Sequence, residues 1–290
     1  MEELKLQTPV LVGRSRVEVS PDDKLCVLGS CFADNIGDKM AELGFNACVN
    51  PFGTLYNPVS VCNSVSRLAS GIPFTEDECV EMGSGAGLVC SFSHPTSFAR
   101  STAEEFLDHA NTSLAAASKA WNEAGKVIIT LGTAWCFEYI PTGEIVSNCL
   151  KIDQKLFRRK RLSVQETSVL LRNLVGRNPG KEFIFTVSPI RHLKDGAHGN
   201  QLSKSILILA VEDVCNAFPE RCEYFPAYEI LLDELRDYRF FDEKMTHPTS
   251  VAVDIVWERF QRATMVPAVR EQAHYNMKQH KREKHIPLHQ

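Results

Sequence analysis

What this 290-residue sequence lacks limits the kinds of protein that it can encode. It has no apolar run near the roughly 18 residues that a membrane-spanning helix needs. Lysine and arginine number 32 against 36 acidic residues, a near balance that gives no general attraction for nucleic acid. There is no internal repeat and no low-complexity segment, which argues against solenoid and disordered architectures. We therefore predict no membrane partner and no nucleic-acid partner.

The cysteines give no sign of a metal site. There are ten of them, scattered, with no Cys-x-x-Cys pair, whereas a structural zinc site uses closely spaced ligands. A chain of this length also needs no disulfide framework. We expect no metal, no cofactor, and thiols that mostly pack as small buried side chains in a reducing compartment. The acidic start, Met-Glu-Glu-Leu-Lys, lacks the features of a secretion signal and predicts a cytoplasmic location.

What the sequence does contain is an alternation of strands and helices. Strands are expected at 25–28, 45–49, 127–131, 183–187 and 223–225. Helices are expected at 32–43, 59–70, 102–121, 164–177, 202–218 and 250–262. This order predicts a parallel sheet with helices on both faces. Two insertions are expected, an irregular one at 71–100 and a hairpin at 136–147 that turns at Pro141-Thr142-Gly143.

Two polar segments are expected to lie outside the core. The basic run 157–161 is interpreted as a solvated face that opens the helix at 164–177, with an anion-binding patch as the alternative. The domain is expected to span 8–262. Residues 263–290, rich in Lys, Arg and His, are expected to form a solvated helix or a frayed tail, and their histidines lack regular ligand spacing.

The first loop after a strand contains a candidate nucleophile. Ligands of parallel sheets sit at the carboxyl ends of the strands, and Gly29-Ser30-Cys31 follows the first of them. The N-terminus of the next helix can hold an oxyanion and can lower a thiol pKa. The plainer interpretation, which the residues alone favour, is a Ser N-cap followed by a buried Cys.

Three later segments add polar candidates. His247, just before Pro248 and the last core helix, can act as a general base. Arg191 can hold an anion and His192 is a second acid or base, because both directly follow a strand. Asn148 lies on a loop that also offers a thiol and an amine. Taken singly, each is as well explained as an ordinary polar loop residue.

Several blocks, in order, resemble the GSCFA family over roughly residues 8–262. The first is Leu28-Gly29-Ser30-Cys31-Phe32-Ala33, the motif that names the family. The others lie at 50–58, 131–135, 147–152, 188–196, 200–204, 224–229 and 237–248. The family looks like a branch of the SGNH (GDSL-like) hydrolases. That resemblance implies a three-layer α/β/α flavodoxin-like fold and esterase or acyl-transfer chemistry.

The resemblance also implies roles for residues, with three departures from the SGNH pattern. The nucleophile register falls on Cys31 rather than Ser30, and the Gly53 N–H would be an oxyanion donor. The expected Asn donor is replaced in Gly132-Thr133-Ala134, which leaves Asn148 or Asn57 as substitutes. The closing Asp-x-x-His has Lys244 in place of Asp, which leaves Asp242 or Glu243.

The leading hypothesis is therefore an enzyme that hydrolyses or transfers an acyl group. Its expected partner is a small-molecule or carbohydrate ester, most simply an acetyl ester. Cys31 or Ser30 would attack, His247 would move the proton, and Arg191 and His192 would orient the substrate. The alternative is a binding module of the same fold that has lost catalysis.

Overall fold

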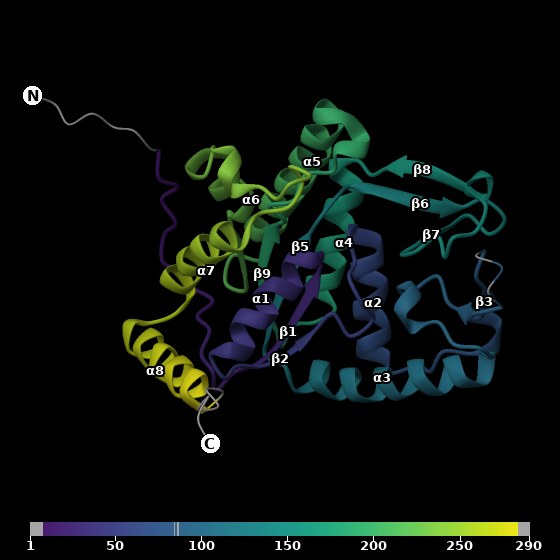
Figure 1. Ribbon diagram of the computed structural model, residues 1–290, viewed down its shortest axis with the longest axis horizontal. Helices are drawn as coiled ribbons and strands as arrows, with labels where there is room; N and C mark the ends of the chain where they lie inside the picture. The colour runs from purple at the N-terminus through teal and green to yellow at the C-terminus, as the bar shows by residue number, and fades with distance from the viewer. Residues whose placement is uncertain (1–7, 84, 86, 284–290) are drawn as a thin grey trace, which may run out of the picture.

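A five-stranded parallel sheet forms the centre of the computed structural model, which describes residues 8–83, 85 and 87–283 (Figure 1). Its strands lie in the order β10-β9-β5-β1-β2, and every neighbouring pair is parallel. Their bounds are β1 Lys24–Gly29, β2 Asn46–Val49, β5 Lys126–Leu131, β9 Glu182–Val187 and β10 Cys222–Phe225. Counted along the chain, this is the flavodoxin-like order in which the second strand lies outside the first. The prediction of an α/β/α fold with a parallel sheet is confirmed.

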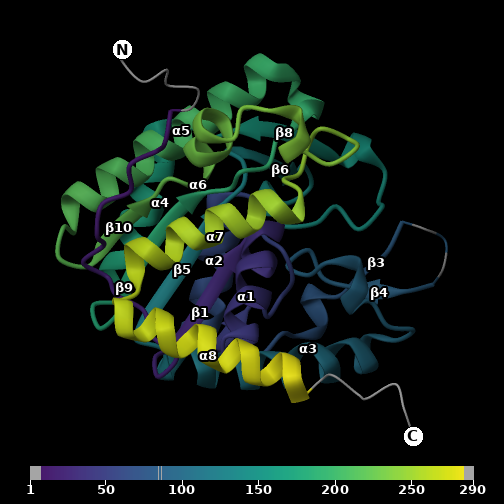
Figure 2. The same ribbon diagram turned by 60° about the vertical axis from the view of Figure 1, so that its left-hand side comes forward.

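Helices cover both faces of this sheet. One face packs against α2 Pro58–Ser70, α3 Ala103–Glu123, α4 Val164–Gly176 and α5 Gly196–Ala217. The other packs against α1 Cys31–Glu42, the short α6 Ala227–Glu229 with the π-helix Ile230–Glu234 that continues it, and α7 Ser250–Thr264. Figure 2 shows α7 and α8 Pro267–Glu283 lying across that second face.

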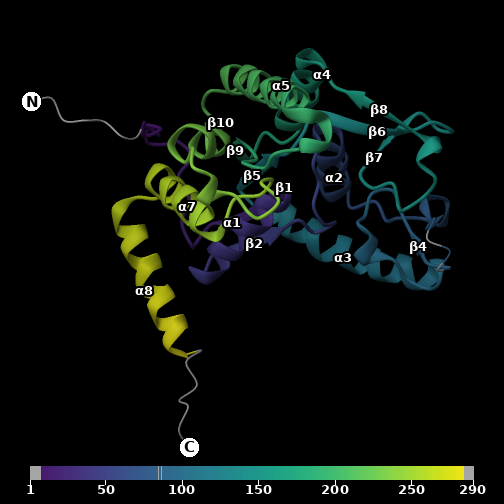
Figure 3. The same ribbon diagram turned by 45° about the horizontal axis from the view of Figure 1, so that its top comes forward.

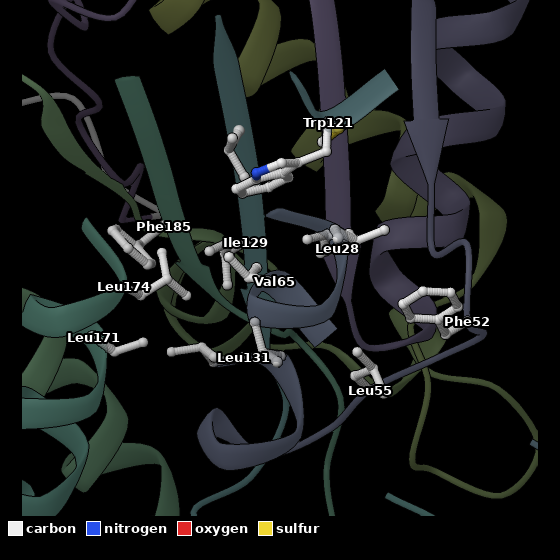
Figure 4. Packing of buried hydrophobic residues seen from close by; sticks show 14 of the residues in the cluster. Leu28, Phe52, Leu55, Val65, Trp121, Ile129, Leu131, Leu171, Leu174 and Phe185 are labelled. Atoms are coloured by element: carbon white, nitrogen blue, oxygen red, sulfur yellow. The ribbon is translucent and has the colours of Figure 1, made fainter. Parts of the chain in front are cut away.

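The buried strands explain this layering. In β1, Cys26 and Leu28 point to one apolar layer, while Leu25 and Val27 point to the other. Side chains alternate along a strand, so a strand that is apolar on both faces needs helices on both sides. Figure 4 shows the first layer, where the Trp121 indole from α3 lies above the strands. Full burial of each such large side chain contributes about 1.5–3 kcal/mol.

Two insertions extend from one side of the sheet. The first, expected to be irregular, holds the short antiparallel pair β3 Val80–Glu81 and β4 Val89–Cys90. The second is a three-stranded antiparallel sheet in the order β7-β6-β8. Its strands are β6 Trp135–Tyr139, β7 Glu144–Val146 and β8 Phe157–Arg161. The predicted hairpin at 136–147 is confirmed as β6 and β7.

The interpretation of the basic run 157–161 as the opening of a helix was wrong. These residues form β8, which pairs with β6 along its whole length. Three of its cations have acidic partners: Arg158 pairs with Glu138, Arg159 with Asp195, and Lys160 with Glu166. The acidic partners neutralise the charge of β8, and its hydrogen bonds with β6 stabilise it. These contacts allow a strand that the basic composition of residues 157–161 does not suggest.

The C-terminal segment is a helix in the part that the structure describes. Helix α7 continues to Thr264, and α8 runs over Pro267–Glu283. Its first half packs on the α7 side of the molecule, because Ala273 is fully buried in the second apolar layer. Of the two forms expected for 263–290, the helix is therefore the one present, and 284–290 lie outside the described residues. Among the described helices, none has the length and hydropathy needed to cross a bilayer.

Candidate functional site

The candidate site lies at the carboxyl end of the parallel sheet. The chain leaves β1 towards β2 on one side, whereas β5 lies on the other, so the strand order reverses between β1 and β5. Loops that diverge at such a switch point leave a crevice for a ligand. The turn after β1 brings Ser30 and Cys31 to this position.

Gly29 makes the tight turn at the end of β1. Its φ is +132°, and a Cβ added there would lie 2.1 Å from the Thr130 carbonyl oxygen. The Ser30 N–H donates to that same oxygen at 3.0 Å. The Asn50 side chain accepts from the Gly29 N–H at 2.8 Å and donates to Asp34 at 2.6 Å. Only glycine allows the turn to press so closely on β5.

Ser30 is a buried helix cap. Its side chain is the N-cap of α1, and the residue is 1% exposed. The Oγ lies 3.1 Å from Thr130 Oγ1 and accepts from the Phe32 N–H at 3.3 Å. The plainer sequence interpretation, a Ser N-cap, is therefore correct for Ser30, and its burial makes it the less favoured of the two candidate nucleophiles.

Cys31 is the first residue of α1 and is half-buried. Burial raises the pKa of its thiol, and the Asp34 carboxylate raises that pKa further. The N–H groups of Cys31 and Phe32 and the Lys204 ammonium act in the opposite direction, but they do not outweigh burial. The expectation that the helix N-terminus lowers this thiol pKa was thus wrong, because desolvation is the larger effect. A nucleophile at Cys31 needs a base at neutral pH.

Lys204 is a site residue to which the sequence interpretation gave no role. It comes from α5 and is fully buried. Its ammonium donates to the carbonyl oxygens of Gly132 at 2.6 Å and Ser188 at 2.8 Å, the residues that follow β5 and β9. Burial lowers the pKa of Lys204 to about 7. A fully buried lysine that donates to two neutral carbonyls, with no acidic partner among its hydrogen bonds in the described residues, is a signal of function that only the fold reveals.

His192 lies beside this lysine on the loop after β9. Burial, and then the Lys204 charge, lower the pKa of His192 to about 4, so its imidazole is neutral at pH 7. Its Nε2 is buried and has no hydrogen-bond partner among the described residues. The Tyr56 ring stands edge-on to it, with centroids 6.3 Å apart. The His192 N–H donates to Asn200 at 2.9 Å, which fixes the loop to α5.

His247 reaches the same end of the sheet from the segment before α7. The Arg191 N–H donates to the Thr246 carbonyl at 2.9 Å, which ties this segment to the loop after β9 (Figure 3). The Arg191 guanidinium lies 5.2 Å from the centroid of the Phe241 ring. His247 is also one of the groups that lower the pKa of His192, after burial and Lys204.

Asp242 supplies the carboxylate that the sequence left uncertain. Its Oδ2 lies 3.5 Å from His247 Nδ1. Its Oδ1 accepts from the N–H groups of Thr246 at 2.9 Å and His247 at 3.1 Å. These bonds, with that of Thr246 the largest cause, lower the pKa of Asp242. The turn at Met245, whose φ is +56°, folds the segment back so that Asp242 contacts His247, five residues later in the sequence.

Two of the expected oxyanion donors already serve their own turns. The Gly53 N–H donates to the Asn50 carbonyl at 2.7 Å. The Asn57 side chain caps α2, because it accepts from the Ser60 N–H and donates to the Ser60 Oγ at 3.0 Å. Asn148 accepts from the Leu150 N–H at 2.8 Å through its Oδ1, a bond that does not use its amide N–H groups. At the crevice, the Cys31 and Phe32 N–H groups at the start of α1 act on the Cys31 sulfur, and the Phe32 N–H also donates to Ser30 Oγ.

The backbone that replaces the expected Asn block is occupied as well. The N–H groups of Gly132 and Thr133 both donate to the Tyr56 carbonyl, at 2.9 and 2.8 Å. The described residues contain no group of three or more His, Cys, Asp or Glu side chains able to hold a metal ion.

Comparison with known proteins identifies one family. A family model described as the GSCFA family matches residues 24–260, from the start of β1 almost to the end of α7. No curated protein and no solved structure matches the chain. The matched range contains the whole parallel sheet, the site residues described above and both insertions.

Proposed function

This chain belongs to the GSCFA family, and from that premise and the geometry at the sheet end we propose that it is an acyl-transfer enzyme with Cys31 as nucleophile. The observation that carries the proposal is the Asp242–His247 pair, whose segment is tied to the loop after β9 at the same end of the sheet as Cys31. The Thr246 hydroxyl lies 2.9 Å from Nδ1 and the Asp242 carboxylate 3.5 Å from it. Together they would orient the imidazole, and the carboxylate would stabilise its protonated form, which leaves Nε2 to take a proton. The raised pKa of Cys31 makes such a base necessary.

The proposed reaction has two balanced steps. The Cys31 sulfur attacks the ester carbonyl carbon, its proton passes to His247, and the C–O bond to the alcohol breaks as His247 returns that proton to the alkoxide. Water or an acceptor alcohol then attacks the thioester carbonyl carbon and gives its proton to His247. The C–S bond breaks, and His247 returns that proton to the Cys31 thiolate. The Cys31 N–H at the start of α1 would donate to the oxyanion in both steps.

The finer parts of the proposal concern the substrate. The flavodoxin-like strand order is that expected for SGNH hydrolases. The proposal of an acetyl ester, with a carbohydrate as its alcohol, rests on the resemblance to those hydrolases alone. Arg191 and the neutral His192 would orient that substrate or its leaving group. Whether water or a second alcohol receives the acyl group decides between an esterase and an acyltransferase.

Turnover of p-nitrophenyl acetate tests this proposal. Cys31→Ala should lose at least about 10³-fold in kcat, and His247→Ala about 10²-fold or more. Asp242→Asn should lose at least about tenfold, less than the effect at a fully buried triad carboxylate. Ser30→Thr, which keeps a capping hydroxyl, is the matched control and should retain most of its activity. Full activity in Cys31→Ala would contradict the assignment.

A binding module that lacks catalysis is the second candidate, and one specific observation favours it. The N–H groups of Gly53, Gly132 and Thr133 all donate to other backbone carbonyls, which leaves few donors for an oxyanion. Under this alternative, the wild type turns over neither a generic acetyl ester nor an acetylated xylo-oligosaccharide, yet it binds the latter.

A further inference from the structure

A cleft separate from the crevice at Cys31 lies between α2 and the β7-β6-β8 sheet. Figures 1 and 3 show α2 next to β7, on the side of the molecule away from α7 and α8. The cleft has a volume of about 840 Å³, within the range of ligand-binding sites. Among the described residues, its lining includes neither Cys31 nor His192 nor His247.

Helix α2 supplies a polar face to this cleft. Val61, Val65 and Leu68 pack into the first apolar layer. The residues on the cleft side return at helical spacing, and they are Ser60, Asn63, Ser64, Arg67 and Ser70. The helix therefore buries one stripe in the core and presents hydroxyl and amide groups to the hollow.

Hydroxyl groups dominate the polar part of the lining. Seven serines line the cleft. The Ser64 Oγ is buried there and has no hydrogen-bond partner among the described residues. A buried hydroxyl without a partner destabilises the fold, and a ligand that offers its own hydroxyls would relieve that cost.

Aromatic rings stand beside these hydroxyls. Phe92 and Tyr139 line the cleft, are both half-buried, and have centroids 4.8 Å apart. Phe157 supports them from behind, with its centroid 5.3 Å from that of Tyr139. Partly exposed rings next to hydroxyl groups fit a ligand with apolar C–H faces and hydroxyl edges, which is the surface of a sugar ring.

The charges of the lining argue against an anionic ligand. Arg67 is the one cation among the described residues of the lining. It is paired with Glu78 and lies 4.3 Å over the Phe74 ring. Asp77 and Glu144 add exposed carboxylates. An anion would meet net negative charge here.

The lining also argues against an extended peptide. The strand that borders the cleft, β7, is only three residues long. The next N–H, that of Ser147, already donates to the Phe92 carbonyl at 2.9 Å. Too little free strand edge remains for a peptide to pair along it.

We propose that this cleft binds an uncharged oligosaccharide chain. One loop that borders the cleft also reaches the sheet-end site. The direction in which the bound chain would run therefore rests on the proposed function, whereas its binding in the cleft does not. Phe52 lines the cleft from the loop that ends at Tyr56, whose ring faces His192. A chain held in the cleft would lead towards Cys31.

Calorimetric titration of the full-length Cys31→Ala protein tests this site without any turnover. The ligands are neutral hexasaccharides of xylose, glucose and mannose, the corresponding monosaccharides, a galacturonic acid hexamer and a Gly-Ser hexapeptide. At least one neutral hexasaccharide should bind, about tenfold or more tightly than its monosaccharide. Because this protein lacks the proposed nucleophile, the result stands or falls independently of the acyl-transfer proposal.

A variant that fills the cleft with a large side chain tests where the saccharide binds, and a second variant on the same helix is its control. Ser66 is exposed on α2 and lines the cleft, whereas Ala69 is exposed on the same helix and does not. Ser66→Trp should weaken binding at least about tenfold and Ala69→Trp should leave it unchanged, with both proteins melting as the parent does. Absence of saccharide binding at millimolar concentration, equal binding by Ser66→Trp, or tighter binding of the acidic hexamer or the peptide would overturn the proposal.

Discussion

At the scale of single residues, the site depends on what burial does to each polar group. Ser30 and Cys31 are neighbours in sequence, yet one is a buried cap and the other is half-exposed at the first turn of α1. The sequence predicted both possibilities for this pair and could not choose, because a cap and a nucleophile use the same residue types. The sequence also failed to predict the direction of the Cys31 pKa shift, because desolvation depends on how distant segments pack around the thiol.

Gly29 carries the most sharply defined steric requirement. Replacing it with alanine puts a Cβ 2.1 Å from the Thr130 oxygen, at a φ of +132°. Gly29→Ala should therefore lower the free energy of unfolding by about 3 kcal/mol or more, as measured by urea denaturation. Gly125→Ala is the control, because no heavy atom lies within 4 Å of its added Cβ, and it should change stability by less than about 0.5 kcal/mol. Equal stabilities for the two variants would show that the turn can relax.

At the scale of elements, the periodicity of apolar residues predicted helices and strands well, whereas the polarity of a segment predicted them poorly. The central strands and the long helices follow apolar patterns, and the sequence placed them within a few residues. β8 was missed because its strand is basic, and its stability comes from pairing with β6 and from acidic partners. Helix α5 begins at Gly196 rather than near 202. Its start was missed because the first turn contains two glycines, which have low helix propensity. That extension carries Asn200, which binds the His192 loop.

Lys204 connects elements in a way that pH can reveal. Its pKa is lowered from 10.5 to about 7 in the fold, so between these values the unfolded chain holds more protons than the folded one. Linkage then requires this lysine to make the free energy of unfolding rise with pH above about 7. Urea unfolding from about pH 7 to pH 8.5, below the ordinary thiol pKa of 9.0, measures that rise.

Lys204→Met removes the titrating group and should flatten this rise. The variant also leaves the carbonyls of Gly132 and Ser188 without their donor, so its stability at any single pH is less informative than its slope. The same slope in the variant and the wild type would mean that the lysine stays protonated in the fold.

At the scale of the whole molecule, the site assembles from segments separated by most of the chain. Cys31 follows β1, Arg191 and His192 follow β9, and His247 precedes α7. A parallel sheet brings such segments to one edge, and for that reason the sequence could predict the edge but not the contacts. The Asp242–His247 pair needs the turn at Met245, and the cleft beside α2 needs the insertion sheet, so neither could be predicted from spacing.

The most direct test of the account is the identity of the residue that carries the acyl group. Wild-type protein would be mixed with p-nitrophenyl acetate, quenched in acid within seconds, digested, and mapped by peptide mass spectrometry. The account predicts an acetyl thioester on Cys31 in the wild type and none in Cys31→Ala. The thioester should accumulate further in His247→Ala if that change slows the second step more than the first. Acetyl on Ser30, or steady turnover with no acetyl on Cys31 in either protein, would contradict it.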